Sequence, residues 1–226
     1  MSTWVIIPVK PLRLAKSRLA NVLSPEDRQR FAEAMLRHVL KVVGEVPQVT
    51  GILVISRDNH ALAIAREYGA KTIQETDAPE LNTALTRASS IVASWRTDAI
   101  LVLPADLPLI AAEDIEQIIQ MGRSPHPSVV IATDRNKDGT NALYIRPPGL
   151  IDYAYGEGSF KRHAVLARDA GAEVHVYQSD RLLQDIDLPE DIENYQRMIA
   201  RGPYKDIFAH AFSALTNSQD FGGEVE

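Results

Sequence analysis

Hydrophobic positions along the chain alternate between short apolar runs and longer stretches with helical spacing. The first run, residues 3–9, reads as a buried strand, and Ser24 to Asp27 then supply an N-cap, a proline and acids that open an amphipathic helix. Asp58 is placed to cap the next helix, which Gly69 ends. This alternation is the βαβ pattern of a mostly parallel sheet with helices on both faces. The predicted strands are 3–9, 51–56, 71–74, 99–103 and 129–132, and the predicted helices begin at 25, 61, 81 and 111.

The second half of the chain departs from this pattern. It predicts strands at 141–145 and 173–177, helices at 160–170 and 190–199, and a short strand around 185–187. We expect the sheet to gain an antiparallel strand here, next to a second substrate site. We therefore expect residues 1–200 to form one domain of the doubly wound α/β class. Residues 201–226 carry Phe208, Phe212 and Leu215 at helical spacing, which predicts a helix that docks on the domain or contacts a second subunit of a homodimer, followed by a frayed tail.

Composition excludes several classes of protein. The 226 residues are 45% hydrophobic and include no cysteine, so disulfides, thiolate metal sites and thiol nucleophiles are all excluded. No apolar run has transmembrane length, and no signal peptide is evident, which favours a cytoplasmic enzyme that does not bind membranes. The net charge of −6 argues against a general nucleic-acid binder.

A basic segment follows the first predicted strand. Lys10, Lys16 and Arg18 lie close together in sequence, at the carboxyl end of a strand, which is where open α/β sheets bind ligands. Clustered cations favour a polyanion such as a nucleoside triphosphate and its pyrophosphate product. The alternative is a solvated basic loop. Neither the GxxxxGK[ST] phosphate loop nor the GxGxxG fingerprint is present, which argues against P-loop kinases and dinucleotide dehydrogenases.

Acidic side chains follow two later elements. Asp106 comes just after the strand 99–103 and stands between two prolines, where it is placed to hold Mg²⁺. Asp185 and Asp187 alternate with Ile186, which puts both carboxylates on one face of the short strand ahead of the last helix. The alternatives are a turn aspartate that bonds local amides and an aspartate that caps the helix. Together the three acids favour a metal that bridges two phosphate-bearing substrates.

Two further segments have the chemistry of substrate contacts. Asn82, at the start of a helix, has the groups to read a base edge or a ribose, although asparagine at such a position is most often an N-cap. Thr140 and the Gly156 to Ser159 turn precede a helix whose first turn carries Lys161, Arg162 and His163. Free amides, hydroxyls and cations at a helix start favour a small phosphorylated or carboxylated acceptor, and an ordinary capped turn is the alternative.

A series of motifs in this chain resembles one enzyme family. PVKPLRLAKSRL, LNTALTRA, LPADLPLI, TDRNKDGTNALY, YGEGSFKRH and QDIDLPEDI occur in that order over about the first 200 residues. They resemble the guanylyltransferases of deazaflavin (coenzyme F-420) biosynthesis, which have a Rossmann-like nucleotidyltransferase fold. The chain departs from that pattern at Glu157, where many relatives have proline, and this leaves the identity of the acceptor open.

The resemblance implies a role for each group of candidate residues. It implies a triphosphate site at Lys10, Lys16 and Arg18, a guanine or ribose contact at Asn82, a metal at Asp106 with Asp185 or Asp187, and acceptor contacts at Thr140, Gly156 and Ser159.

The residues and the resemblance together imply Mg²⁺-dependent transfer of GMP from GTP to a small phosphorylated acid, with release of pyrophosphate. Phosphoenolpyruvate, 2-phospho-L-lactate and 3-phosphoglycerate all offer one carboxylate and one phosphate, so the residues do not choose among them. Two other classes stay open. One is another nucleotidyltransferase of the same fold, acting on a sugar phosphate or a molybdenum-cofactor precursor, and the other is a regulatory nucleotide-binding module.

Overall fold

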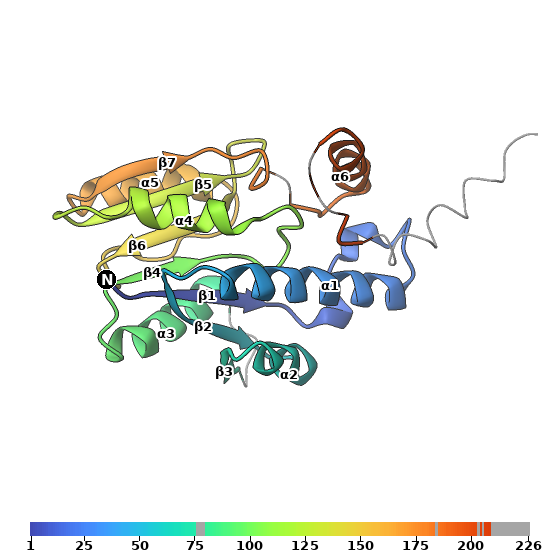
Figure 1. The fold of residues 1–226 in the computed structure, drawn as a ribbon, viewed down its shortest axis with the longest axis horizontal. Coiled ribbons are helices and arrows are strands. Elements are labelled where there is room, and N and C mark those ends of the chain that lie inside the picture. The colour runs from blue at the N-terminus through green and yellow to red at the C-terminus, as the bar shows by residue number, and fades with distance from the viewer. Residues whose placement is uncertain (76–79, 184, 203, 205, 209–226) are drawn as a thin grey trace, which may run out of the picture.

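The protein folds as one mixed sheet between helices, as seen in a computed structural model that describes residues 1–75, 80–183, 185–202, 204 and 206–208 (Figure 1). The strands are β1 (Thr3–Val9), β2 (Val49–Ser56), β3 (Lys71–Gln74), β4 (Ala99–Val102), β5 (Ser128–Thr133), β6 (Thr140–Arg146) and β7 (Glu173–Tyr177). The helices are α1 (Pro25–Gly44), α2 (Asn59–Glu67), α3 (Leu81–Ser94), α4 (Ala112–Met121), α5 (Ser159–Asp169) and α6 (Pro189–Arg201), with single 3₁₀ turns η1 (Leu12–Leu14) and η2 (Ser17–Leu19).

The sheet has seven strands in the order β3-β2-β1-β4-β6-β5-β7. β6 runs antiparallel to both neighbours, β4 and β5, whereas the other paired strands are parallel. The expected α/β class and the expected antiparallel strand in the second half are therefore both confirmed.

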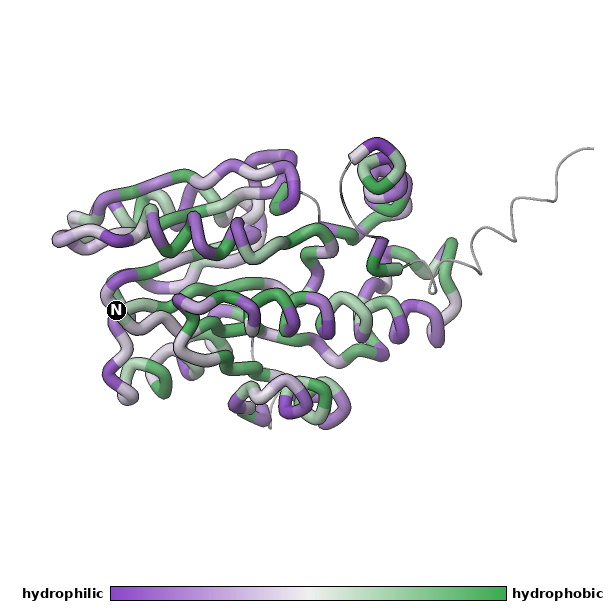
Figure 2. Tube along the Cα trace, in the orientation of Figure 1, coloured by the Kyte–Doolittle hydropathy of each residue, from purple (hydrophilic) through white to green (hydrophobic). Residues whose placement is uncertain are grey.

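Both faces of the sheet are covered, so the central strands read as continuous apolar runs. Val5 and Ile7 of β1 point into a core formed with α1, α2 and α4, and Ile6 points into the opposite core formed with α3 and α5. Figure 2 shows the same arrangement, with green, hydrophobic segments along the strands and purple positions on the outer sides of the helices.

A third, smaller core fastens the region after β1 to the end of the chain. Leu19 of η2, Phe31 of α1, Tyr195 of α6 and Phe208 pack together there, and the rings of Phe31 and Phe208 are 4.4 Å apart. Phe208 is fully buried, as expected for a docked C-terminal segment. Phe212 and Leu215, and with them the predicted helix and tail, lie outside the described residues.

Local signals set the helix starts. Ser24 Oγ accepts the N–H of Asp27 at 3.1 Å, and the Asp58 carboxylate accepts the N–H of His60 at 2.9 Å, so both predicted caps are confirmed. The helix after Asp58 begins at Asn59, slightly before the predicted start.

The short strand predicted around 185–187 is wrong. The N–H of Asp187 donates to Asp191 Oδ2 at 3.0 Å, inside the first turn of α6, and not to a neighbouring strand. Neither Asp185 nor Asp187 caps that helix, because its N-cap is Leu188, and the Leu188 N–H also donates to Asp191 Oδ2, at 2.7 Å.

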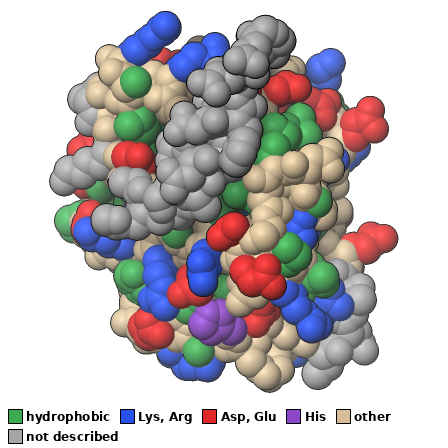
Figure 3. Space-filling model, turned by 90° about the vertical axis from the view of Figure 1, so that its right-hand side faces the viewer, with side chains coloured by type: hydrophobic (Ala, Val, Ile, Leu, Met, Phe, Trp, Pro, Cys, Tyr) green, Lys and Arg blue, Asp and Glu red, His purple; other side chains and the backbone are tan. Residues whose placement is uncertain are grey.

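The topology brings many strand ends to one edge of the sheet. β1 to β5 and β7 end there, and antiparallel β6 begins there: its first residue, Thr140, pairs with Thr133, the last residue of β5. Figure 3 views this end of the molecule and shows positively and negatively charged side chains next to one another. The residues that the sequence singles out after β1 and β4 and at the start of β6 therefore converge at the same edge.

Candidate active site

A cavity of about 650 Å³ opens at this edge, within the usual size of small-molecule sites. Its polar lining comes from several strand ends: Lys10, Lys16 and Arg18 after β1, Arg57 after β2, Glu75 after β3, Asp106 after β4, and Asp187 ahead of α6. All three predicted cations and two of the three predicted acids thus line a single cavity.

Lys16 is the central side chain of the charged part of this site. Its Nζ lies 2.6 Å from Asp106 Oδ2 and 2.9 Å from Asp187 Oδ1, and only 5% of the side chain is exposed. The backbone of Lys16 is left-handed, with φ of 55°, a conformation that is costly for any residue other than glycine. The chain accepts this cost at the point where Lys16 reaches both carboxylates.

Burial and charge have opposite effects on the pKa values of Lys16 and Asp187. Burial lowers the pKa of Lys16, but the charges of Asp106 and Asp187 outweigh it and hold that pKa above its usual value. Burial likewise raises the pKa of Asp187, and the positive charge of Lys16 brings it below its usual value. Burial, and then the negative charges of Asp106 and Asp187, raise the pKa of Asp185 to about 6. Negative charge is therefore only partly neutralised here.

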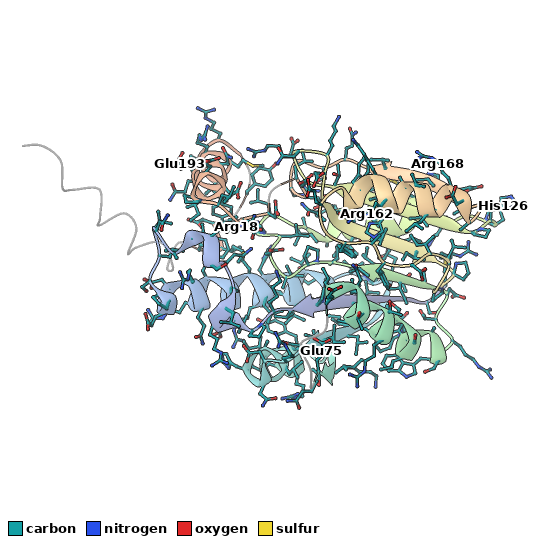
Figure 4. All side chains as sticks on the ribbon, turned by 180° about the vertical axis from the view of Figure 1, so that it is seen from behind. Arg18, Glu75, His126, Arg162, Arg168 and Glu193 are labelled. Carbon is teal, nitrogen blue, oxygen red and sulfur yellow. The ribbon has the colours of Figure 1, made fainter. Side chains whose placement is uncertain are left out.

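The other cations of the loop are more accessible. Arg18 Nη1 is 4.0 Å from Asp187 Oδ2, and 70% of its side chain is exposed (Figure 4). Lys10 is exposed at the mouth of the cavity. Both side chains are free to move onto an anion, whereas Lys16 is already held in place.

The loop is anchored by a contact that the sequence analysis missed. While Asp58 Oδ1 caps α2, its Oδ2 accepts the N–H of Leu12 at 2.7 Å. One carboxylate thus ties the turn after β1 to the start of α2. An aspartate at a helix start is visible in the sequence, but its second partner, 46 positions away, is not.

The acids present have the right chemistry for Mg²⁺. Among the described residues, no three acidic, histidine or cysteine side chains form a ready metal site. However, Asp106 and Asp187 both contact Lys16 Nζ and so lie close together, and Mg²⁺ commonly uses one or two carboxylates together with phosphate oxygens from substrate. The carboxylate pair fits a cation that arrives with a nucleotide.

Asn82 has a different role in the structure from a helix cap. Its Oδ1 accepts the N–H of Tyr155 at 2.8 Å, and its Nδ2 donates to the Tyr155 carbonyl oxygen at 3.3 Å. The N-cap of α3 is Glu80. Asn82 thus joins the start of α3, beside the cavity residues Leu81 and Ala84, to the segment that leads into α5.

The predicted acceptor residues form a second cluster. Thr140 Oγ1 lies 3.1 Å from Ser159 Oγ, and both side chains are buried. Gly156 has φ of +117°, which L side chains rarely adopt. The Asp138 carboxylate accepts the N–H of Gly158 at 3.0 Å and fixes the turn before Ser159.

The first turn of α5 is less cationic than the sequence suggests. His163 is fully buried, and burial, followed by the nearby charge of Arg162, lowers its pKa to about 4, so it is neutral near pH 7. The Arg162 guanidinium donates to the carbonyl oxygens of Ala154 and Glu157 and closes the turn (Figure 4). The cations of this turn therefore support the backbone around the cluster.

Two further cavity residues were not singled out from the sequence. Arg57 and Glu75 directly follow β2 and β3, so their position after a predicted strand was the available signal. Burial raises the pKa of Glu75, and its Oε1 is buried without a hydrogen-bond partner among the described residues. They lie on the side of the cavity away from Asp106, because β2 and β3 are on one side of β1 and β4 is on the other.

The fold is that of the nucleotidyltransferases with a Rossmann-like sheet. A solved structure from Desulfovibrio desulfuricans, assigned as a nucleotide-diphospho-sugar transferase, superposes with a TM-score of 0.76 at 14% identity and covers 97% of this chain and 96% of its own. At that identity the likeness concerns the fold alone.

The sequence comparisons are more specific. The family described as guanylyl transferase CofC like matches residues 3–202. A phosphoenolpyruvate guanylyltransferase of Rubrobacter xylanophilus is 38% identical, over 85% of this chain and 92% of the relative. A 2-phospho-L-lactate guanylyltransferase of Methanocaldococcus vulcanius is 36% identical, over 83% of this chain and 81% of the relative. The chain belongs to the CofC-like guanylyl transferase family, and the resemblance drawn from the motifs is confirmed.

No described helix combines the length and apolar character that a bilayer crossing requires.

Proposed function

We propose that this protein transfers GMP from GTP to a small phosphorylated carboxylic acid and releases pyrophosphate. The observation that carries the proposal is the position of Lys16 between Asp106 and Asp187, inside a cavity of nucleotide size at the carboxyl ends of the strands. Family membership supports guanylyl transfer, and the cluster supports chemistry on a polyphosphate.

The cations would bind the triphosphate. Lys10 and Arg18 are exposed at the cavity and can close on the β- and γ-phosphates, and Arg18 can do so with two parallel hydrogen bonds. Lys16, already oriented by the two carboxylates, would contact the phosphates nearest the bond that breaks. Positively charged side chains would thus surround the leaving pyrophosphate, on which negative charge develops.

Asp106 and Asp187 would hold Mg²⁺ together with phosphate oxygens, and Asp185 would add negative charge close by. Bound Mg²⁺ would neutralise charge on the reacting phosphates and orient them.

The acceptor would bind at Thr140, Gly156 and Ser159, beside the start of β6. Its own phosphate oxygen would attack the α-phosphorus of GTP in line, so that a new P–O–P bond forms while the bond from the α-phosphorus to the bridging oxygen of pyrophosphate breaks. A phosphate monoester is largely ionised near neutral pH, so no side chain needs to act as nucleophile or base. Catalysis then rests on positioning and charge.

The decisive experiment is incubation with each of the four nucleoside triphosphates, Mg²⁺ and one acceptor at a time, followed by pyrophosphate release. The acceptors are phosphoenolpyruvate, 2-phospho-L-lactate and 3-phosphoglycerate, with a hexose 1-phosphate as the contrasting substrate. We expect release with GTP and at least one phospho-acid. Release only with the sugar phosphate, or only with another nucleotide, would contradict the proposal.

The proposal has three further parts, which concern the biosynthetic role, the location and the oligomeric state of the protein. The reaction would serve coenzyme F-420 biosynthesis, it would take place in the cytoplasm, and the protein would act as a homodimer. Sedimentation at micromolar concentration tests the last of these directly.

A further inference from the structure

His163 is the buried centre of the acceptor cluster. Its Nδ1 lies 3.0 Å from Thr140 Oγ1, and its Nε2 accepts the backbone N–H of Ala154 at 3.0 Å. The Tyr155 ring and the imidazole pack in a T-shaped arrangement, with ring centroids 4.9 Å apart. The ring is therefore held at both nitrogens and across one side.

The backbone contact fixes where the ring carries its proton. A backbone N–H only donates, so Nε2 must be the unprotonated, accepting nitrogen. In a neutral imidazole the proton is then on Nδ1, and His163 donates to Thr140 Oγ1.

This assignment determines how many hydroxyl hydrogens remain. Thr140 and Ser159 bring two hydroxyl hydrogens, and their mutual hydrogen bond at 3.1 Å uses one of them. The ring uses none, because its Nδ1 donates to Thr140 and its Nε2 is occupied by the Ala154 N–H. One hydroxyl hydrogen of the pair therefore stays available for a third group, whichever of the two residues carries it. With the opposite tautomer, the ring would take that hydrogen.

We propose that His163 is a positioning residue, which keeps one hydroxyl hydrogen of the Thr140–Ser159 pair available to a carboxylate or phosphate oxygen of the acceptor. The inference rests on the proposed function, since it takes the acceptor to bind at this pair. His163 itself need not touch the acceptor. It acts through Thr140, and the Ala154 N–H sets its direction.

A pair of substitutions separates the two ring contacts. The amide of Asn reaches about as far as Nδ1, and the amide of Gln about as far as Nε2. His163→Asn therefore keeps a donor toward Thr140 and loses the Ala154 contact, whereas His163→Gln does the reverse. In His163→Gln nothing donates to Thr140 Oγ1, so the hydroxyl pair is no longer held in one arrangement, and we expect the acceptor KM to rise roughly tenfold. His163→Asn should stay much closer to wild type, and the GTP KM should be unchanged in both variants. His126→Gln, at an exposed position at the other end of the molecule, is the control (Figure 4).

The inference is overturned if the two variants raise the acceptor KM equally, or if the GTP KM rises with it. Both results would indicate a purely structural histidine. Absence of pyrophosphate release in the wild-type enzyme with GTP and every phospho-acid would instead contradict the proposed function.

A measurement on the wild-type protein does not depend on how the variants fold. Nitrogen NMR with labelled histidine should show His163 protonated at Nδ1 near pH 7, and phosphoenolpyruvate or 2-phospho-L-lactate should shift that signal. An Nε2-protonated ring would overturn the inference.

Discussion

The two halves of the candidate site are held in place by opposite means. In the half near β1 and β4, Lys16 is fixed by full charges on Asp106 and Asp187, and the exposed Arg18 is close by. In the half near β6 and α5, Thr140, Ser159 and His163 are neutral, buried and joined by hydrogen bonds. The first half can exchange its ion pairs for those of a charged ligand, whereas the second presents a geometry fixed before any ligand arrives.

This difference matches the two substrates of the proposed reaction. A triphosphate that arrives with Mg²⁺ brings both signs of charge, so pre-existing ion pairs can be replaced at little net cost. A small acid has few atoms with which to select its site, and donors that are already oriented reduce the entropy lost on binding. Asn82 links the halves, because its side chain holds the backbone of Tyr155 next to Ala154.

The largest expected effect tests the charged half. Asp106→Asn removes the charge that Lys16 and a bound metal would share, and we expect the rate to fall about a thousandfold, equivalent to about 4 kcal/mol, while the fold survives. Pyrophosphate release at saturating Mg²⁺ is the measurement. Asp169→Asn, at the exposed end of α5, is the matched control. Near-normal turnover of the Asp106 variant would remove that residue from the site.

The sequence was most informative about features that local residues determine. The strand at 3–9 and the caps at Ser24 and Asp58 depend on neighbours within a few positions, and all three were predicted. The strand around 185–187 was predicted wrongly, because a strand needs a partner that spacing alone does not reveal. The link from Asn82 to Tyr155 spans 73 positions, so no local pattern contains it.

The sequence could not reveal the charge state of His163, because that depends on how deeply the ring is buried. His163 follows a lysine and an arginine, and from this it was predicted to be part of a cationic turn. The structure buries the ring completely, and desolvation makes it neutral. The site's cations, by contrast, were found because a basic loop directly after an apolar strand is visible in the sequence itself.

The second prediction concerns the stability of the neutral half. Since folding lowers the pKa of His163 from 6.5 to about 4, the unfolded chain binds more protons between these values. The contribution of neutral His163 is thus complete above about pH 6.5 and falls by about 3 kcal/mol as the pH drops to about 4.

Urea unfolding of wild type and His163→Asn across this range isolates the effect, because titrations of other groups cancel in the difference. The relevant neighbours are the charge of Arg162 and the ring of Tyr155, which both proteins retain. A stability difference that is independent of pH would show that the ring titrates normally.

The third prediction returns to the charged half. Lys16→Ala removes the ammonium between the two carboxylates, and we expect kcat/KM for GTP to fall about a hundredfold, as is typical for loss of a hydrogen bond to a charged group. Added salt should weaken GTP binding in the wild type and do so less in the variant. Arg13→Ala, on an exposed side chain of the same loop that does not line the cavity, is the control. Unchanged GTP affinity of the Lys16 variant by calorimetry would contradict a triphosphate site at this loop.

The smallest expected effect tests whether the halves are independent. Ser159→Ala removes one of the two hydroxyls in the acceptor cluster, which should cost about 1–2 kcal/mol of acceptor binding, or roughly a tenfold rise in the acceptor KM. The GTP KM should not change, because Ser159 is buried beside Thr140 and is not among the residues that line the cavity. Ser94→Ala, on the exposed surface of α3, controls for a nonspecific loss of stability. If Ser159→Ala weakens GTP binding and leaves the acceptor KM alone, the neutral half serves the nucleotide, and the assignment of the two substrates is reversed.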